Sequence, residues 1–212
     1  MKFIIYLHGF NSSPSSEKAC LTKEFFQTRQ VKINETHAVK GDALNVVIPN
    51  LPPSPLDAVA KVNDLIQELG IENVAGFIGS SLGGYLSLYF QHQFAQMDRK
   101  IKVVLINPAI KPYELLIDYL GDNQNPYTGE RYSVEMSHME DLRSLAVKTS
   151  ARADNTFLLV QAGDEVLDFK QSVAALAKAK MWVQPKGNHA FLYFVRTLPA
   201  IYSFFQSTKS DL

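Results

Sequence analysis

A serine between two glycines is the feature of this chain that most clearly suggests chemistry. The segment Gly79-Ser80-Ser81-Leu82-Gly83 fits the pattern G-x-S-x-G, with Ser81 at its centre. It follows the apolar run VAGFI and precedes the helix-like run LGGYLSLYFQHQFA, the strand–turn–helix context of a nucleophilic serine. Side chains two residues before or after the serine would collide in so sharp a turn, which explains both flanking glycines. Ser80 is off-centre and is the weaker candidate.

Two further residues, His189 and Asp164, could act with Ser81 to make it a nucleophile. His189 follows the last expected strand in the loop PKGNHAF, where its ring could take the proton of Ser81. Asp164 follows the apolar run TFLLVQAG and could accept a hydrogen bond from that ring, which would fix its tautomer. The order serine, aspartate, histidine, each after a strand, is typical of one hydrolase arrangement. The alternatives are an ordinary surface histidine and a glycine-rich turn without catalysis.

Other acidic and imidazole side chains compete for these roles. Asp168 precedes the helix-like run FKQSVAALAKA, so it has a ready explanation as a helix N-cap. Glu165 is a third choice of carboxylate. A role on the substrate side stays open for one of the histidines, His138, which lies in a long connection. The remaining two lack a comparable setting: His37 and His92.

The loop after the first expected strand offers a site for a developing negative charge. The residues His8-Gly9-Phe10 end that strand, and a tight turn there would point the amide of Phe10 into the space above Ser81. The amide of Leu82, at a helix N-terminus, is the second candidate donor. We expect His8 to orient the loop.

Six short β-branched or aromatic runs, separated by helix-like segments, must position these residues. The pattern predicts strands at 2–7, 45–48, 74–78, 102–106, 156–161 and 181–183, and helices at 15–29, 56–69, 82–95, 169–178 and 190–205. Strands that are apolar on both faces indicate a parallel sheet covered by helices on both sides. The sequence therefore predicts an α/β fold.

One long connection interrupts this alternation. Residues 109–153 contain no expected strand, a helix at 113–120, the polar segment GDNQNPYTGERY and a weaker helix near 136–145. Long insertions at strand ends commonly form lids and substrate walls. We expect residues 1–212 to form one domain with a lid-like insertion at about 109–153, the alternative being an extra packing layer. Five of its residues could line an acyl pocket or be core: Tyr113, Leu116, Tyr119, Tyr127 and Tyr132.

Composition argues against several classes of function. The chain has 21 basic and 21 acidic residues, so no charge bias favours nucleic acid or an anionic membrane. No run approaches the roughly 20 apolar residues of a membrane span, and no signal peptide is evident; a cytoplasmic protein is expected. The single cysteine, Cys20, is expected to be a buried structural thiol. No metal-binding or phosphate-binding motif occurs.

Together these segments resemble the α/β-hydrolase superfamily, and nearly the whole chain is similar to small bacterial esterases of the YqiA type. The likeness rests on IIYLHGFNSSPSSEKA, GSSLGGYLS, INPAIKPYELL, QAGDEVLD and GNHAF. It implies a catalytic triad of Ser81, Asp164 and His189, with the Phe10 and Leu82 amides as oxyanion hole. It also implies a trimmed α/β-hydrolase fold, with a six-stranded parallel sheet in order 2-1-3-4-5-6.

The resemblance further implies a serine esterase that hydrolyses short-chain acyl esters, with a small-molecule ester as partner and no cofactor. It does not indicate an oligomeric state. Three alternatives stay open: an acyl-thioesterase, a different reaction such as peptide cleavage or elimination on the same residues, and a binding protein without catalysis on the hydrolase fold.

Overall fold

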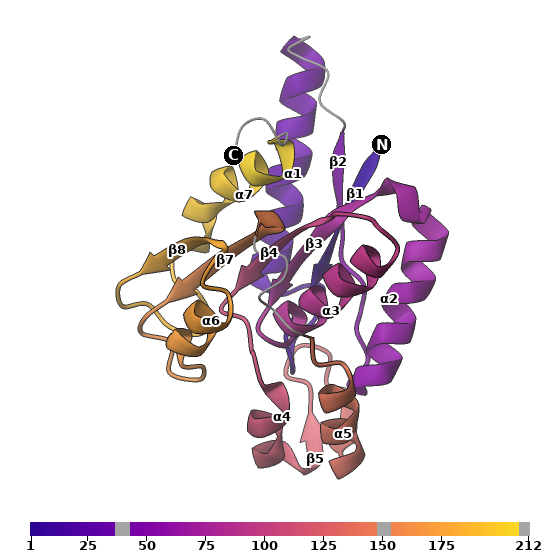
Figure 1. The fold of residues 1–212 in the computed structure, drawn as a ribbon, viewed down its shortest axis with the longest axis vertical. Coiled ribbons are helices and arrows are strands. Elements are labelled where there is room, and N and C mark those ends of the chain that lie inside the picture. Colours follow the sequence, from indigo (N-terminus) through magenta and orange to yellow (C-terminus); the bar gives the residue numbers. More distant parts are fainter. Residues whose placement is uncertain (37–42, 148–153, 208–212) are drawn as a thin grey trace.

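Six parallel strands form the central sheet of the computed structural model, which describes residues 1–36, 43–147 and 154–207. The order β2-β1-β3-β4-β7-β8 confirms the predicted order 2-1-3-4-5-6, because β7 and β8 are the fifth and sixth strands of this sheet (Figure 1). The strands are β1 (Lys2–Leu7), β2 (Leu44–Val47), β3 (Val74–Ser80), β4 (Lys102–Ile106), β7 (Thr156–Gln161) and β8 (Lys180–Gln184).

Helices connect these strands nearly as predicted. They are α1 (Glu17–Thr36), α2 (Pro55–Leu69), α3 (Leu82–Gln96), α6 (Phe169–Ala175) and α7 (Leu198–Gln206), with short 3-10 turns at Ile71–Asn73 and Phe194–Thr197. The predicted helix at 190–205 begins later, because Phe191 and Tyr193 have positive φ and cannot continue a helix. Within the described ranges, no helix has the length and apolar content needed to cross a membrane.

Alternate side chains of the strands enter two cores, one on each face of the sheet. Ile5 and Leu7 pack with α2 and α3, whereas Ile4 and Tyr6 pack with α1 and α7, as the two-residue period of a strand requires. The prediction of helices on both faces is therefore correct (Figure 1).

Cys20 departs from the sequence prediction. The buried face of α1 carries Ala19, Thr22 and Phe26, which are spaced three and four residues apart as one side of a helix requires. Cys20 lies outside this spacing and its side chain is exposed. The expectation of a buried structural thiol is therefore wrong.

The connection between β4 and β7 contains a hairpin that was not predicted. The strands β5 (Gly121–Gln124) and β6 (Arg131–Val134) pair antiparallel, after α4 (Pro112–Leu115) and a 3-10 turn (Leu116–Tyr119) and before α5 (Met136–Ser144). The expectation of no strand here is wrong, because two short, mostly exposed polar strands lack the apolar run by which strands are recognised. Figure 1 shows α4, β5 and α5 beyond the carboxyl ends of the sheet. His37 and residues 148–153 lie outside the described residues.

A bulge at the centre of the sheet depends on a glycine. The register between β1 and β3 shifts between Phe3 and Ile4, and Gly76 follows the shift. A Cβ atom at Gly76 would lie 1.9 Å from the carbonyl oxygen of Lys102 on β4. Because that oxygen belongs to the backbone, this collision can be relieved only if the two strands move apart.

We therefore expect Gly76→Ala to lower the free energy of unfolding by about 3 kcal/mol or more, measured by urea denaturation. Gly129→Ala is the control, because Gly129 has a φ of 73° and meets only the Gln124 side chain, at 3.9 Å. It should lose about 1 kcal/mol from backbone conformation alone. Equal losses in the two variants would show that the collision does not matter.

Candidate active site

Ser81 lies in the sharp turn between β3 and α3, with φ 53° and ψ −119°. The amide of Ser81 donates to the carbonyl of Ile106 at 3.0 Å, and its carbonyl accepts from Ala109 at 3.1 Å. A Cβ atom at Gly79 would lie 2.2 Å from the Gly83 carbonyl oxygen, and one at Gly83 would lie 2.0 Å from that of Leu7. The steric explanation for both glycines agrees with these contacts.

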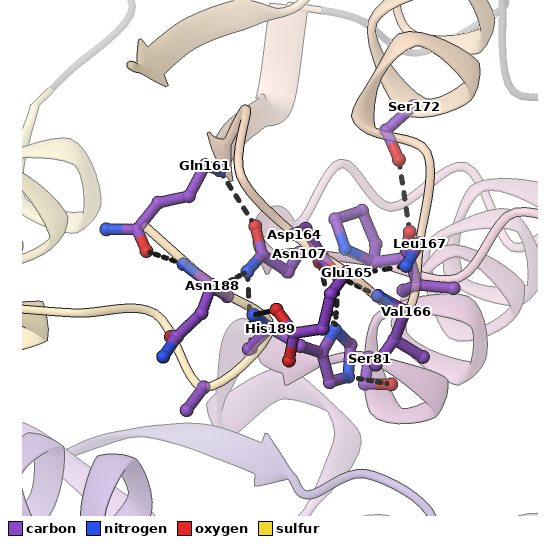
Figure 2. A network of polar contacts seen from close by, with 12 residues as sticks. Ser81, Asn107, Gln161, Asp164, Glu165, Val166, Leu167, Ser172, Asn188 and His189 are labelled. Carbon is purple, nitrogen blue, oxygen red and sulfur yellow. Dashed lines mark hydrogen bonds and ion pairs between the residues drawn. The ribbon is translucent and has the colours of Figure 1, made fainter. Parts of the chain in front are cut away.

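Three residues singled out from the sequence meet in one chain of hydrogen bonds (Figure 2). His189 Nε2 lies 3.1 Å from Ser81 Oγ, and His189 Nδ1 lies 2.9 Å from Asp164 Oδ2. With the ring proton on Nδ1, Nε2 presents its lone pair to the serine hydroxyl. The arrangement can therefore move a proton from the serine to the histidine.

The side chain of Asp164 is buried, since only 1% of it is exposed. Burial by itself raises the pKa of its carboxyl, but hydrogen bonds from His189, Leu167 and Val166 and the charge of His189 outweigh it, so the pKa lies below its ordinary value. The Val166 and Leu167 amides reach Asp164 Oδ1 at 2.9 and 2.8 Å. Asp164 is thus held ionised and in one orientation.

The competing acidic residues have structural tasks. Asp168 is the N-cap of α6 and accepts a hydrogen bond from the Lys170 amide at 3.0 Å, which confirms the capping interpretation. Glu165 accepts from the backbone amide of His189 at 3.1 Å, so it holds the loop of His189 by its backbone. Sequence reasoning ranked Glu165 as a carboxylate candidate and missed this contact.

Two buried amide side chains at strand ends also hold the histidine loop, and both were missed. Asn107, which follows β4, donates from its side-chain amide to the carbonyls of Asn188 and His189 at 3.0 and 3.2 Å. Its side-chain oxygen accepts from the backbone amide of Gln161 at 3.0 Å. Gln161, at the end of β7, accepts from the backbone amide of Asn188 at 3.0 Å (Figure 2) and from that of Leu192 at 2.9 Å. Each is 2% exposed. The sequence feature that could have pointed to both roles is a polar residue directly at the end of an apolar strand.

Lys18 supports the same loop from α1. Its ammonium group donates to the carbonyl of Ala190, the residue after His189, at 2.9 Å. Burial, which outweighs the charges of Glu17 and Asp164, lowers the pKa of Lys18. The loop that carries His189 is thus hydrogen-bonded to α1, to Asn107 after β4, to Gln161 of β7 and to Glu165 in the loop after β7.

The loop after β1 passes over the serine. A Cβ atom at Gly9 would lie 3.2 Å from Ser81 Cβ and 3.7 Å from its Oγ. His8 donates from Nδ1 to the Gly9 carbonyl at 3.0 Å and accepts at Nε2 from the Leu51 amide at 3.2 Å. Burial lowers the pKa of His8 despite the bond to Gly9, which favours the neutral ring. His8 therefore orients this loop, as expected.

The predicted oxyanion donors lie on the two segments that meet at Ser81. Phe10 follows Gly9 in this loop, and Leu82 is the first residue of α3. Within the described part of the chain, neither backbone amide donates a hydrogen bond to another group. Two free amides beside a serine can bind a developing negative charge.

Ser81 and His189 open into a cleft of about 350 Å³, whose wall also includes Lys18, Tyr127 and Glu165. A smaller hollow of about 30 Å³ lies beside it, lined by residues that include Phe10, Leu82 and Tyr132. Of the five residues proposed to line an acyl pocket, Tyr127 and Tyr132 thus line a cavity.

The other three members of that set have different surroundings. Leu116 is in the core, Tyr113 packs against the core and the Arg143 guanidinium, and Tyr119, 45% exposed, lies edge-on to the Phe10 ring. His138 accepts from the Glu135 amide at the start of α5, at 3.1 Å. Among the described residues, no three His, Cys, Asp or Glu side chains gather as metal ligands.

Comparison with known proteins identifies relatives and the fold. A family model described as "Uncharacterised protein family (UPF0227)" matches residues 3–206. Est1E from Butyrivibrio proteoclasticus superposes with a TM-score of 0.70 at 13% identity, over 96% of this chain and 86% of that one. The esterase domain of a Rhodothermus marinus protein gives a TM-score of 0.68 at 13% identity, over 97% and 86%.

A mammalian protein shares the same architecture. Alpha/beta hydrolase domain-containing protein 10 from mouse gives a TM-score of 0.63 at 16% identity, over 95% of this chain and 89% of that one. These similarities extend over nearly the whole chain. The fold is therefore the α/β-hydrolase fold, which confirms the fold expected from the sequence resemblance.

The lowered pKa of Asp164 predicts how stability changes with acidity. Because this pKa lies below the ordinary value of 3.8, the unfolded chain binds the proton more readily than the folded chain. The stability that the carboxylate contributes is full above the ordinary pKa and is lost as the pH falls through the folded value. From about pH 5 to about pH 2, the free energy of unfolding should fall more steeply for the wild type than for Asp164→Asn. Parallel curves from denaturant titrations would contradict this.

Proposed function

The chain belongs to the uncharacterised protein family UPF0227, and we propose that it is a serine hydrolase that cleaves short-chain acyl esters through an acyl-enzyme intermediate. The observation that carries this proposal is the hydrogen-bond chain from Ser81 Oγ through His189 to Asp164, with links of 3.1 and 2.9 Å. A serine, a histidine and a buried carboxylate in this order can activate a nucleophile at neutral pH.

In the first half of the reaction, Ser81 Oγ bonds to the ester carbonyl carbon while its proton passes to His189 Nε2. The carboxylate of Asp164 stabilises the resulting imidazolium, and the amides of Phe10 and Leu82 hold the negative oxygen. When the carbonyl forms again, the bond to the alkoxy oxygen breaks. The imidazolium gives its proton to that oxygen, and the alcohol leaves with the acyl group on Ser81.

In the second half, water takes the place of the alcohol. His189 Nε2 accepts a proton from the water as its oxygen bonds to the acyl carbon, and the same two amides hold the oxyanion. The bond to Ser81 Oγ then breaks, His189 returns the proton to the serine, and the carboxylic acid leaves. One histidine therefore acts as base and acid in each half.

The cavity dimensions support a short acyl group. The hollow beside Phe10 and Leu82 holds about 30 Å³, little more than one or two water molecules need. The larger cleft of about 350 Å³ is open and carries charged side chains, Lys18 and Glu165 among them. A small acyl chain and a polar alcohol fit these surroundings better than two apolar chains.

A fluorophosphonate probe tests the activated serine. We expect the wild type to be labelled, and Ser81→Ala and His189→Ala to remain unlabelled, because the first removes the nucleophile and the second its base. The control is Ser80→Ala, which removes the neighbouring hydroxyl and should leave labelling intact. Labelling is followed by gel fluorescence and intact mass.

An unlabelled but folded wild type would rule out the hydrolase mechanism and favour a binding protein. Where labelling occurs, turnover of an oxygen ester and a thioester with the same acyl group separates the esterase from an acyl-thioesterase. The proposal expects the oxygen ester to be the better substrate.

Asp164→Asn should lower kcat about 10³- to 10⁴-fold in ester hydrolysis, because an amide cannot stabilise the imidazolium and favours the wrong tautomer. The matched control is Asp168→Asn, the same exchange at the N-cap of α6. Asparagine caps helices as well as aspartate does, so kcat should stay within about twofold of the wild type. A similar kcat in both variants would remove Asp164 from the mechanism.

A further inference from the structure

The β5–β6 hairpin of the insertion contacts the loop that carries Phe10. The hydroxyl of Tyr132, on β6, donates to Asn11 Oδ1. The side-chain amide of Asn125, in the hairpin turn, donates to the Ser12 carbonyl at 2.9 Å. The Phe10 ring lies edge-on to the Tyr132 ring, with the centroids 6.1 Å apart. Three successive loop residues are thus held by one hairpin.

The loop needs such support because its backbone is held in an uncommon conformation. Asn11 has a φ of 51°, a left-handed conformation that asparagine adopts at some cost. The hydrogen bond from the Leu51 backbone amide to His8 Nε2 fixes the start of the loop. The Tyr132 hydroxyl contacts the loop one residue after Phe10, at Asn11. The Phe10 amide therefore lies, along the chain, between two fixed residues, His8 and Asn11.

Tyr132 is suited to be the donor in this contact. Burial, assisted by the charge of Glu130, raises its pKa to about 12, so the hydroxyl keeps its proton at neutral pH. The Asn11 side-chain oxygen can only accept, so the direction of the hydrogen bond is defined.

We propose that Tyr132 is a positioning residue that holds the Phe10 amide in place for the oxyanion, through its hydrogen bond to Asn11. The inference rests on the proposed function, since it assigns Tyr132 to the same site. An oxyanion donor acts over a narrow range of distances, about 2.7 to 3.1 Å. A small shift of the loop would weaken oxyanion binding and leave the rest of the cleft unchanged.

The kinetic consequence separates positioning from substrate contact. The negative oxygen exists in the transition state and not in the bound ester, so loss of Tyr132 support lowers kcat and leaves KM nearly unchanged. A residue that only touched the substrate would raise KM. A residue needed only for folding would change the fraction of active protein and the melting temperature, but not the kcat per labelled serine.

The test compares two Tyr→Phe exchanges in the same insertion. Tyr132→Phe keeps the ring against Phe10 and removes the donor to Asn11. Tyr119→Phe is the matched control, because the Tyr119 ring packs on the same Phe10 ring at 5.1 Å, while its hydroxyl makes no hydrogen bond within the described ranges. We expect kcat per phosphonate-reactive serine to fall about tenfold in Tyr132→Phe, with KM within about twofold, and little change in Tyr119→Phe.

A double-mutant cycle with Asn11→Gly tests the route of the effect. Glycine adopts the positive φ of Asn11 without strain and removes the acceptor. If Tyr132 acts through Asn11, Tyr132→Phe should not lower kcat any further in a protein that already carries Asn11→Gly. The cycle also keeps the test decisive should either single variant lose melting temperature, because kcat is counted per labelled serine.

Three results would overturn the inference: equal kcat in the two Tyr→Phe variants, a rise in KM alone, or additive losses in the cycle. If the wild type is labelled and turns over while these results appear, the inference fails and the proposed function stands. If the folded wild type is never labelled, the proposed function fails and the inference fails with it.

Discussion

The site depends on one close approach, between α3 and β1. With only hydrogen on Gly83, the first turn of α3 lies against the carbonyl of Leu7, where a Cβ atom would be 2.0 Å away. This contact allows the sharp turn at Ser81 to persist despite its φ of 53°, because the surrounding backbone leaves it no other path. The same approach brings the loop after β1 over the serine, so that Gly9 lies beside Ser81. The candidate nucleophile and the candidate oxyanion donors are therefore positioned together.

The histidine is held in a different way, by buried polar side chains. Its loop follows β8, an edge strand whose side chains are largely exposed, so this strand offers it little apolar packing. Asn107 and Gln161 fix it by hydrogen bonds, and each is 2% exposed. A buried amide that loses its partners costs about 1–3 kcal/mol, so one arrangement of the loop is favoured over others. Glycine sterics position the serine, and satisfied amides position the histidine.

This difference explains how much could be predicted from the sequence. The six sheet strands and the serine turn follow from local patterns, apolar runs and glycine spacing, and both were predicted. The roles of Asn107 and Gln161 depend on partners distant in the sequence, Asn188 and Leu192 among them, so a local pattern shows only that a polar residue ends each strand. The β5–β6 hairpin was missed for a related reason, since its strands pair with each other through exposed polar residues and bury little apolar surface.

In the proposed mechanism, reaction class and substrate class therefore depend on different parts of the chain. A serine activated by a neutral histidine attacks a carbonyl carbon whether the leaving atom is oxygen or sulfur, so in the proposed mechanism Ser81, His189 and Asp164 account for acyl transfer and do not select the ester. Selection must come from groups that meet the acyl chain and the leaving group. Candidates for such groups are Tyr127 and Tyr132 of the insertion, which line the cleft and the hollow beside it. The hydroxyl of Tyr132 also donates to Asn11, in the loop of Phe10. In the proposed mechanism, a change at Tyr132 that alters the substrate would therefore also move a proposed oxyanion donor, and specificity and rate would change together.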